Sequence, residues 1–234
     1  MSAEPNSSPL YVDSPRRVVR VEVEAGVNET GRVEAFSDGV FAIAITLLIL
    51  EIKVPEVEPG QSLWGALGHL WPSYAAYVVS FLVIGIIWMN HHQFLAHLAR
   101  VDRVALFLNL LLLMTVSALP WPTSVVAAYL RDGDDAKIAM AVYGGFMVLF
   151  STAFSLFWWY VTRRGHLFHD YVDTEGARAT RGRFALGMLL YPCTVGLAFV
   201  SAVGTLILHG VLAVYYAFNQ LPVPVRADSG TAAD

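Results

Sequence analysis

Residues 32–50 read RVEAFSDGVFAIAITLLIL. An arginine, a serine and an aspartate (Arg32, Ser37 and Asp38) open a segment that afterwards offers only apolar side chains and one hydroxyl, that of Thr46. Ionisable groups at membrane depth are unfavourable, so they usually face protein or water and often mark an ion path. The segment therefore indicates a pore gated by hydrophobic contact rather than a catalytic pocket.

The composition indicates a membrane protein. Of the 234 residues, 56% are hydrophobic and 15% are charged, against about 25% charged in an average soluble protein. Several apolar runs approach or exceed the roughly 20 residues that a helix needs to cross a bilayer. We predict an all-α, polytopic membrane protein. No phosphate-binding glycine loop, nucleophile elbow or paired catalytic carboxylates are visible, so we expect neither an enzyme nor a nucleic-acid-binding protein.

Six membrane helices are expected, between a flexible tail at 1–30 and a second one at 221–234. The helices are predicted at about 33–53, 64–90, 103–127, 136–162, 182–203 and 205–220. Only the sequence SAVGT, residues 201–205, separates the last two. One continuous helix of about 38 residues would reach nearly 57 Å, well beyond a bilayer core of about 30 Å. Two helices joined by a tight turn are therefore predicted, within a single channel domain at 31–220.

The distribution of basic residues predicts the orientation. With the N-terminus in the cytosol, twelve of the fifteen basic residues fall on the cytosolic side: Arg16, Arg17, Arg20, Arg32, Arg100, Arg103, Arg163, Arg164, Arg178, Arg181, Arg183 and Arg226. Only Lys53, Arg131 and Lys137 fall on the outer side. Cytosolic loops carry the excess of lysine and arginine, so both termini are predicted to be cytosolic.

The first helix carries an apolar stripe with alternating spacings of four and three residues. Its members are Phe36, Val40, Ile43, Leu47, Leu50 and Val54. Such a stripe suits packing around a parallel symmetry axis. The pairs Ala35/Gly39 and Ala42/Thr46, each four residues apart, let helix backbones approach closely. Ordinary packing inside a helical bundle explains the same pattern, so spacing alone leaves both interpretations open.

The polar residues of this helix also admit two interpretations. Ser37 and Asp38 can cap a helix N-terminus or join a hydrogen-bond network with neighbouring helices. The hydroxyl of Thr46 can bond back to a carbonyl one turn earlier, or form a polar ring that replaces part of an ion's hydration shell. Position alone does not separate these alternatives.

The second predicted helix ends in a polar and aromatic cluster, Trp88-Met-Asn-His91-His92-Gln-Phe, followed by His97. It can be an interfacial belt or a network that holds the Ser37–Asp38 end of the first helix. Asn109, inside an apolar run, favours the network, because a buried amide needs a partner. No histidine pair has an i, i+4 spacing, and there is no cysteine cluster or HExxH motif. We therefore expect no metal site and no cofactor.

The motif Arg32-x-x-x-Phe36-Ser37-Asp38, continuing into Gly39-Val-Phe-Ala-Ile43-Ala-Ile-Thr46-Leu47-Leu, resembles the first-helix signature of the transmembrane protein 175 family. These are endosomal and lysosomal potassium channels and their prokaryotic relatives. Trp88, His91 and Asn109 extend the resemblance. It implies a potassium-permeable leak channel without a carbonyl-lined selectivity filter, in which K⁺ is the permeant ion.

The resemblance also implies roles for individual residues. First helices line the pore, with Ile43 at the narrowest point and Leu47 and Leu50 further along the stripe. Thr46 aids the preference for potassium. Arg32, Phe36, Ser37, Asp38, Trp88, His91 and Asn109 are expected to tie the first helix to its neighbours. Since animal members carry two six-helix repeats and prokaryotic members one, the resemblance implies a homotetramer in the lipid bilayer of a prokaryotic plasma membrane.

Two other functions stay open on the sequence. A proton-coupled carrier could use Asp38 and the histidines of the second helix as a relay. A membrane enzyme or haem protein is the third possibility. The prediction that we retain is the channel, with a hydrophobic constriction on its first helix.

Overall fold

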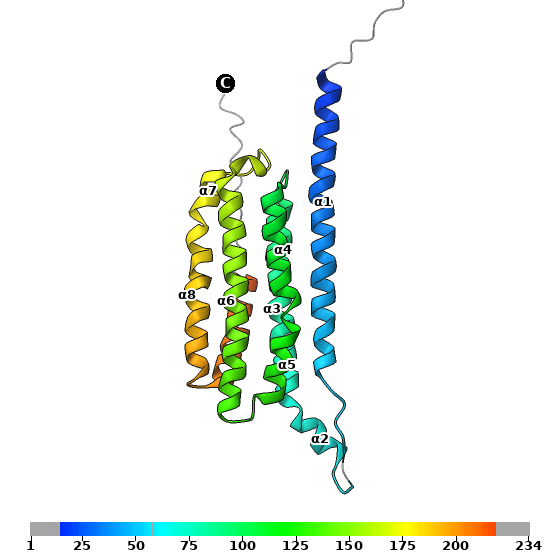
Figure 1. Ribbon diagram of the computed structural model, residues 1–234, viewed down its shortest axis with the longest axis vertical. Coiled ribbons are helices and arrows are strands. Elements are labelled where there is room, and N and C mark those ends of the chain that lie inside the picture. Colours follow the sequence, from blue (N-terminus) through cyan, green and yellow to red (C-terminus); the bar gives the residue numbers. More distant parts are fainter. Residues whose placement is uncertain (1–14, 58, 219–234) are drawn as a thin grey trace, which may run out of the picture.

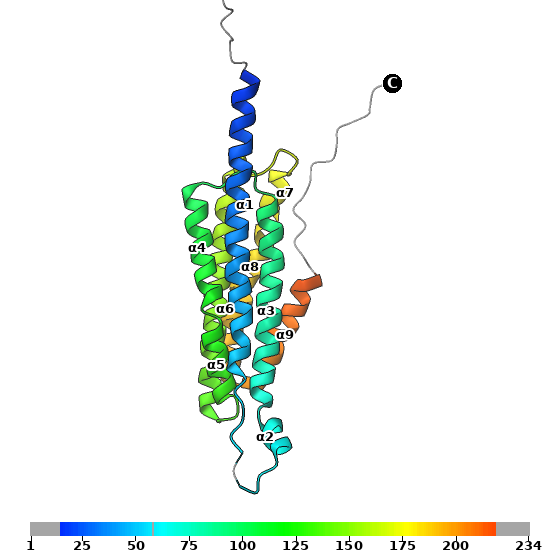
Figure 2. The ribbon, with the colours of Figure 1, turned by 90° about the vertical axis from the view of Figure 1, so that its right-hand side faces the viewer.

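The computed structural model describes residues 15–57 and 59–218, with side chains described for 30–57, 59–182 and 187–218. Every regular element of this part is a helix (Figures 1 and 2). The elements are α1 (Pro15–Leu47), η1 (Leu48–Glu51), α2 (Leu63–His69), α3 (Trp71–Ala96), α4 (Arg103–Ser117), α5 (Pro120–Tyr129), α6 (Asp134–Arg163), η2 (Gly165–Leu167), α7 (Thr174–Ala179), α8 (Arg181–Ala198) and α9 (Ala202–Phe218).

The long helices form an up-and-down bundle with α1 at one edge. In Figure 1, α1 stands on the side of the bundle opposite α8. It packs against α3, α4 and α5, whereas α6 packs against α4, α5, α8 and α9. We call the end with Arg32 and the loops 97–102 and 164–173 the basic end, because Arg100, Arg103, Arg163 and Arg164 also lie there. The opposite end carries the loop between η1 and α2.

Four helical segments are long and apolar enough to cross a membrane. They are Thr30–Glu51, Trp71–Ala96, Arg103–Tyr129 and Asp134–Arg163. Two shorter apolar helices, Gly187–Ala198 and Ala202–Phe218, follow. The prediction of an all-helical membrane fold is therefore confirmed for the described residues, with four spans by length and composition. That the two shorter apolar helices also cross the membrane, which would make six, stays a prediction.

Prolines divide two of the predicted helices. The helix predicted at 64–90 is α2 followed by α3, which begins at Trp71 with Pro72 in its first turn. The helix predicted at 103–127 is α4 followed by α5, which begins at Pro120. A proline lacks a backbone N–H, so it is tolerated in the first turn of a helix and interrupts one elsewhere. The helix α3 also runs on to Ala96, which places His91 and His92 inside it.

The first helix is longer than predicted. It begins at Pro15, so residues 15–30 are helical and not part of an irregular tail. Proline suits the first helical position, and the arginines and glutamates that follow are good helix formers. Figure 2 shows that this part of α1 extends past the rest of the bundle. Residues 1–14 and 219–234, which include the rest of both predicted tails, lie outside the described residues.

The predicted break between the last two helices is confirmed. The helix α8 ends at Ala198, and α9 begins at Ala202. Ser201 begins α9, because its hydroxyl accepts a hydrogen bond from the backbone N–H of Gly204 at 3.1 Å and its carbonyl accepts from Thr205. The serine thus supplies the cap that lets the chain reverse here.

Asp102 joins two helices at the basic end. One carboxylate oxygen caps α4 by accepting from the backbone N–H of Ala105 at 2.8 Å. The other accepts from the hydroxyl of Tyr160 on α6 at 2.6 Å. Burial alone raises the pKa of Asp102, but the hydrogen bonds from Tyr160 and the backbone outweigh it and hold this pKa below its usual value of 3.8. The link is therefore present at neutral pH and lost only as the pH falls through the depressed pKa.

We expect Asp102→Ala to lower the melting temperature of the purified protein, because loss of a helix N-cap costs about 1 kcal/mol. Thermal unfolding followed by intrinsic fluorescence at pH 7.5 and at pH 5 measures the change, which should be the same at both values. Asp170→Ala is the control, since Asp170 is exposed in the loop after η2. Equal melting temperatures for Asp102→Ala and wild type would show that this link does not stabilise the bundle.

Candidate functional site

The helix α1 presents two different faces. Ser37, Phe41, Ala44 and Leu48 are buried against the bundle. Another face carries members of the apolar stripe. The predicted pore residues Ile43, Leu47 and Leu50 are 61%, 41% and 66% exposed, and Phe36, which was predicted to contact neighbouring helices, is 56% exposed. A single copy of the chain therefore leaves uncovered the stripe that the sequence singled out.

Small residues lie beside this stripe. Ala35, Gly39 and Ala42 are all exposed, and a Cβ atom added to Gly39 would meet nothing within 4 Å. Thr46 is also exposed, and its hydroxyl donates to the carbonyls of Ala42 at 2.8 Å and Ile43 at 3.0 Å. The side chains on this part of the exposed face are therefore small, which lets another helix approach closely.

A buried network fixes the other face of α1. The side-chain amide of Asn109 on α4 donates to the hydroxyl of Ser37 at 3.0 Å, and this hydroxyl donates to the carbonyl of Val33 at 2.8 Å. The carbonyl oxygen of the Asn109 amide lies 2.8 Å from Nε2 of His91 on α3. Since that oxygen only accepts, the imidazole is the donor. Three helices therefore meet in one satisfied set of hydrogen bonds.

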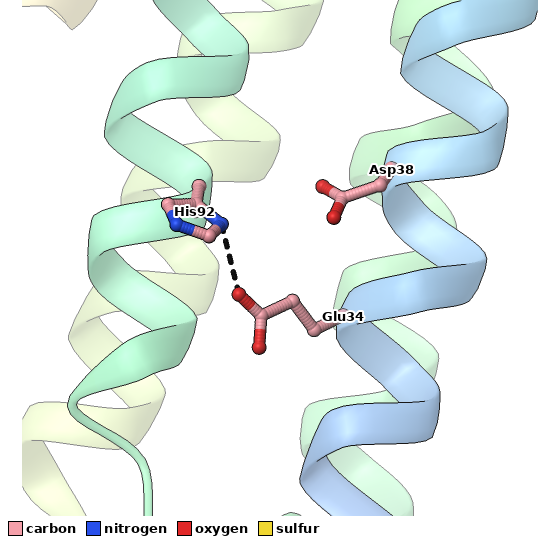
Figure 3. A group of neighbouring side chains, drawn as sticks. All are labelled: Glu34, Asp38 and His92. Carbon is pink, nitrogen blue, oxygen red and sulfur yellow. Dashed lines mark ion pairs between the residues drawn. The ribbon is translucent and has the colours of Figure 1, made fainter.

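A second, more exposed set of contacts lies beside it. The indole N–H of Trp88 donates to Oδ1 of Asp38 at 2.8 Å. Nδ1 of His92 lies 2.8 Å from Oε1 of Glu34, and the rings of Trp88 and His92 stack with their centroids 5.7 Å apart. Figure 3 shows Glu34 and Asp38 reaching from α1 toward His92 on α3.

These residues lie in the part of the chain that a known family shares. A profile of the family described as "Endosomal/lysosomal potassium channel TMEM175" matches residues 32–120. A protein of Streptomyces collinus described as a potassium channel is 64% identical over 200 residues, which make up 86% of this chain and 97% of that protein. The chain belongs to the TMEM175 family.

Further TMEM175 relatives support the fold. The crystal structure of a lysosomal potassium-selective channel TMEM175 homolog from Chamaesiphon minutus has a TM-score of 0.74 and 38% sequence identity, and the match covers 83% of this chain and 99% of that one. The mouse protein described as the endosomal/lysosomal proton channel TMEM175 is 33% identical over 217 residues. These residues are 83% of this chain and 42% of the mouse protein, so the chain spans less than half of it.

The structure brings together most of the inter-helix residues that the TMEM175 resemblance implied. Ser37, His91 and Asn109 form one network, and Asp38 and Trp88 form a direct hydrogen bond. Arg32 and Phe36 are different: both are exposed, and Arg32 forms no hydrogen bond or ion pair with any residue between 30 and 218 whose side chain is described. Those two residues are not part of the network within one copy of the chain.

Sequence reasoning named His92 as part of a polar and aromatic cluster but did not single out Glu34 as its partner. Glu34 lies four residues before Asp38, so the two carboxylates share one side of α1. The signal in the sequence is this i, i+4 carboxylate pair, which a search for histidine pairs alone does not reveal. Their ligand atoms and that of His92 all lie within 4.8 Å of one another.

Proposed function

We propose that the chain forms a homotetrameric, potassium-permeable leak channel in which four copies of α1 surround a central pore. Ile43 forms the constriction, Leu47 and Leu50 line the same stripe, and Thr46 aids the preference for potassium. The six apolar helices cross the plasma membrane of a prokaryote, with both termini in the cytosol. The basic end is then the cytosolic end.

One observation carries this proposal: the uncovered apolar stripe of α1. Phe36, Ile43 and Leu50 are all more than half exposed in one copy, although they belong to the segment that the family profile matches, residues 32–120. A face that only contacted lipid would not need the adjoining row of small residues. Packing of identical helices at close range accounts for both features.

A ring of branched apolar side chains can gate without a carbonyl filter. When a narrow apolar constriction closes slightly, water leaves it, and a hydrated ion then meets a barrier to passage. Ile43 lies one turn before Leu47 on the same face, so the apolar zone would extend along the axis. Relatives described as potassium channels support K⁺ as the permeant ion here.

The carrier alternative, a relay of Asp38 and the histidines of the second helix, is not favoured, because the relatives are described as channels. One of those histidines, His91, is also buried, with its Nε2 bonded to Asn109. Bi-ionic single-channel recording in planar bilayers, with K⁺ on one side and Na⁺ on the other, tests the proposal. Discrete openings with a reversal potential favouring K⁺ are expected. Saturable transport that depends on a pH gradient, without openings, would indicate the carrier.

We expect Thr46→Val to reduce the permeability ratio of K⁺ to Na⁺ about threefold, since a polar contact in a membrane protein contributes about 0.6 kcal/mol and each 1.4 kcal/mol is a factor of ten. The reversal potential under bi-ionic conditions measures this ratio. Thr152→Val is the matched control, because Thr152 is exposed on α6 and makes the same kind of bond to its own helix, to Val148. A ratio unchanged by Thr46→Val would remove Thr46 from the selectivity mechanism.

A further inference from the structure

Three side chains converge between α1 and α3 near the basic end. Glu34 and Asp38 extend from α1 one helical turn apart, and His92 faces them from α3 (Figure 3). One potential ligand atom from each lies within 4.8 Å of the other two. Two ligands at i, i+4 on one helix and a third from a facing helix can surround a single ion.

The charge of this cluster favours a cation. Two carboxylates against one imidazole leave a net negative charge even when His92 is protonated. Among residues with described side chains, no lysine or arginine pairs with Glu34 or Asp38. Both acids lie in the candidate span Thr30–Glu51, where an uncompensated charge is unfavourable. A divalent cation bound to both carboxylates and a neutral imidazole would cancel it.

The surroundings hold the three groups in place. Trp88 donates to Oδ1 of Asp38 and stacks on His92, so one side chain orients two members of the cluster. Groups that bind metals are typically oriented by such outer contacts. The side chain of His92 is 47% exposed and that of Glu34 26%, which leaves a path for an ion.

We propose that Glu34, Asp38 and His92 bind a divalent transition-metal ion of the zinc class, which links α1 to α3. Zinc accepts an imidazole nitrogen together with carboxylate oxygens, and water can complete its four-coordinate shell. Magnesium is a poorer match, because it prefers oxygen ligands and retains its own water. The ligand atoms would have to move somewhat closer together to reach zinc–ligand distances of about 2.0–2.2 Å.

The position of the site would let the bound ion regulate the channel. This regulatory effect rests on the proposed function, in which α1 lines the pore. Ile43 follows Asp38 by five residues on α1, or about 7.5 Å along the axis. An ion held by both helices would resist movement of α1 relative to α3. Because α1 carries the proposed constriction, Zn²⁺ would change the open probability of the channel.

Zinc titration of the tag-free, full-length protein by isothermal calorimetry tests the site without requiring current. We expect one Zn²⁺ per chain, bound at least about tenfold more weakly by Glu34→Gln and by His92→Gln. Trp88→Phe should weaken binding less, because it removes only an orienting hydrogen bond. Glu175→Gln and His166→Gln are matched controls at the basic end, exposed and outside the cluster, and should bind as the wild type does.

Several results would overturn the site. Wild-type affinity in both Glu34→Gln and His92→Gln would do so, and so would an equal loss in the two controls. If the variants do not assemble, anomalous scattering at the zinc edge from wild-type crystals decides the matter: a peak between α1 and α3 supports the site, and zinc found only elsewhere contradicts it.

Recordings of K⁺ current test the regulatory effect of Zn²⁺ separately from the proposed channel function. Zn²⁺ applied to the basic end should change open probability in the wild type and not in His92→Gln. Binding without this response would contradict the regulatory effect and leave the site standing. Absence of K⁺ current under all conditions would count against the proposed function, and the calorimetric result would still decide the site.

Discussion

Replacing Ile43 by asparagine is expected to raise the unitary potassium conductance about tenfold and to weaken the preference for K⁺ over Na⁺. Ile43 is exposed in one copy of the chain, and in the proposed assembly four such side chains form the narrowest apolar ring. Asparagine keeps water in that ring. Lowering the barrier to ion passage by only about 1.4 kcal/mol accounts for a tenfold faster passage.

Single-channel recording of Ile43→Asn in symmetric KCl measures the conductance, and bi-ionic recording measures the selectivity. Ile207→Asn is a matched control, because Ile207 on α9 is also 61% exposed but lies outside the proposed pore. Its conductance should equal that of the wild type. If both quantities are unchanged in Ile43→Asn, the constriction lies elsewhere.

The second large effect is expected from Asn109→Leu, which should destabilise the protein by about 1–3 kcal/mol. Leucine has a similar size but offers no partner to His91 Nε2 or to Ser37. A buried polar group left without a partner costs about 1–3 kcal/mol, and the side chain of His91 on α3 is buried. Since Asn109 joins α4 to both α1 and α3, its loss also loosens the attachment of α1.

Thermal denaturation followed by fluorescence-detected size exclusion measures the stability of the assembled protein. Asn90→Leu is the control, because among the residues with described side chains Asn90 bonds only to the carbonyl of Ile86 in its own helix, at 2.9 Å. A double-mutant cycle of Asn109→Leu with His91→Phe should show clear non-additivity, since both substitutions break the same hydrogen bond. Strictly additive effects would mean that the two residues act independently.

Much of the fold was predictable because the length of an apolar run is a strong signal for a membrane helix. The helix α6 was predicted at 136–162 and spans Asp134–Arg163, and the turn around Ser201 was correctly identified. The helix breaks before Trp71 and Pro120 occur where a proline interrupts a long apolar run. The hydropathy of such a run is the same on both sides of the proline, so hydropathy alone does not locate the break. The helical residues 15–30 were missed because they are polar and follow a proline-containing segment, as the residues of an irregular tail do.

Much of the inter-helix network was predictable for a different reason. Polar residues at similar depth in an apolar protein favour contact with one another, and the family resemblance implied that this set forms a network: Ser37, Asp38, Trp88, His91 and Asn109. Arg32 and Phe36 belong to the same family motif, yet both are exposed in a single copy. The Glu34–His92 contact was missed because Glu34 looked like an ordinary charged residue near a helix end.

The roles of Ile43, Leu47, Leu50 and Thr46 stay predictions, because a pore on a symmetry axis exists only between copies of the chain. Cryo-electron microscopy of the full-length protein in lipid nanodiscs tests the central claim most directly. We predict four copies with their α1 helices around one axis and the Ile43 side chains converging at its narrowest point. An assembly in which Ile43 faces lipid, or in which the continuous water-filled route runs past other helices, would contradict the account.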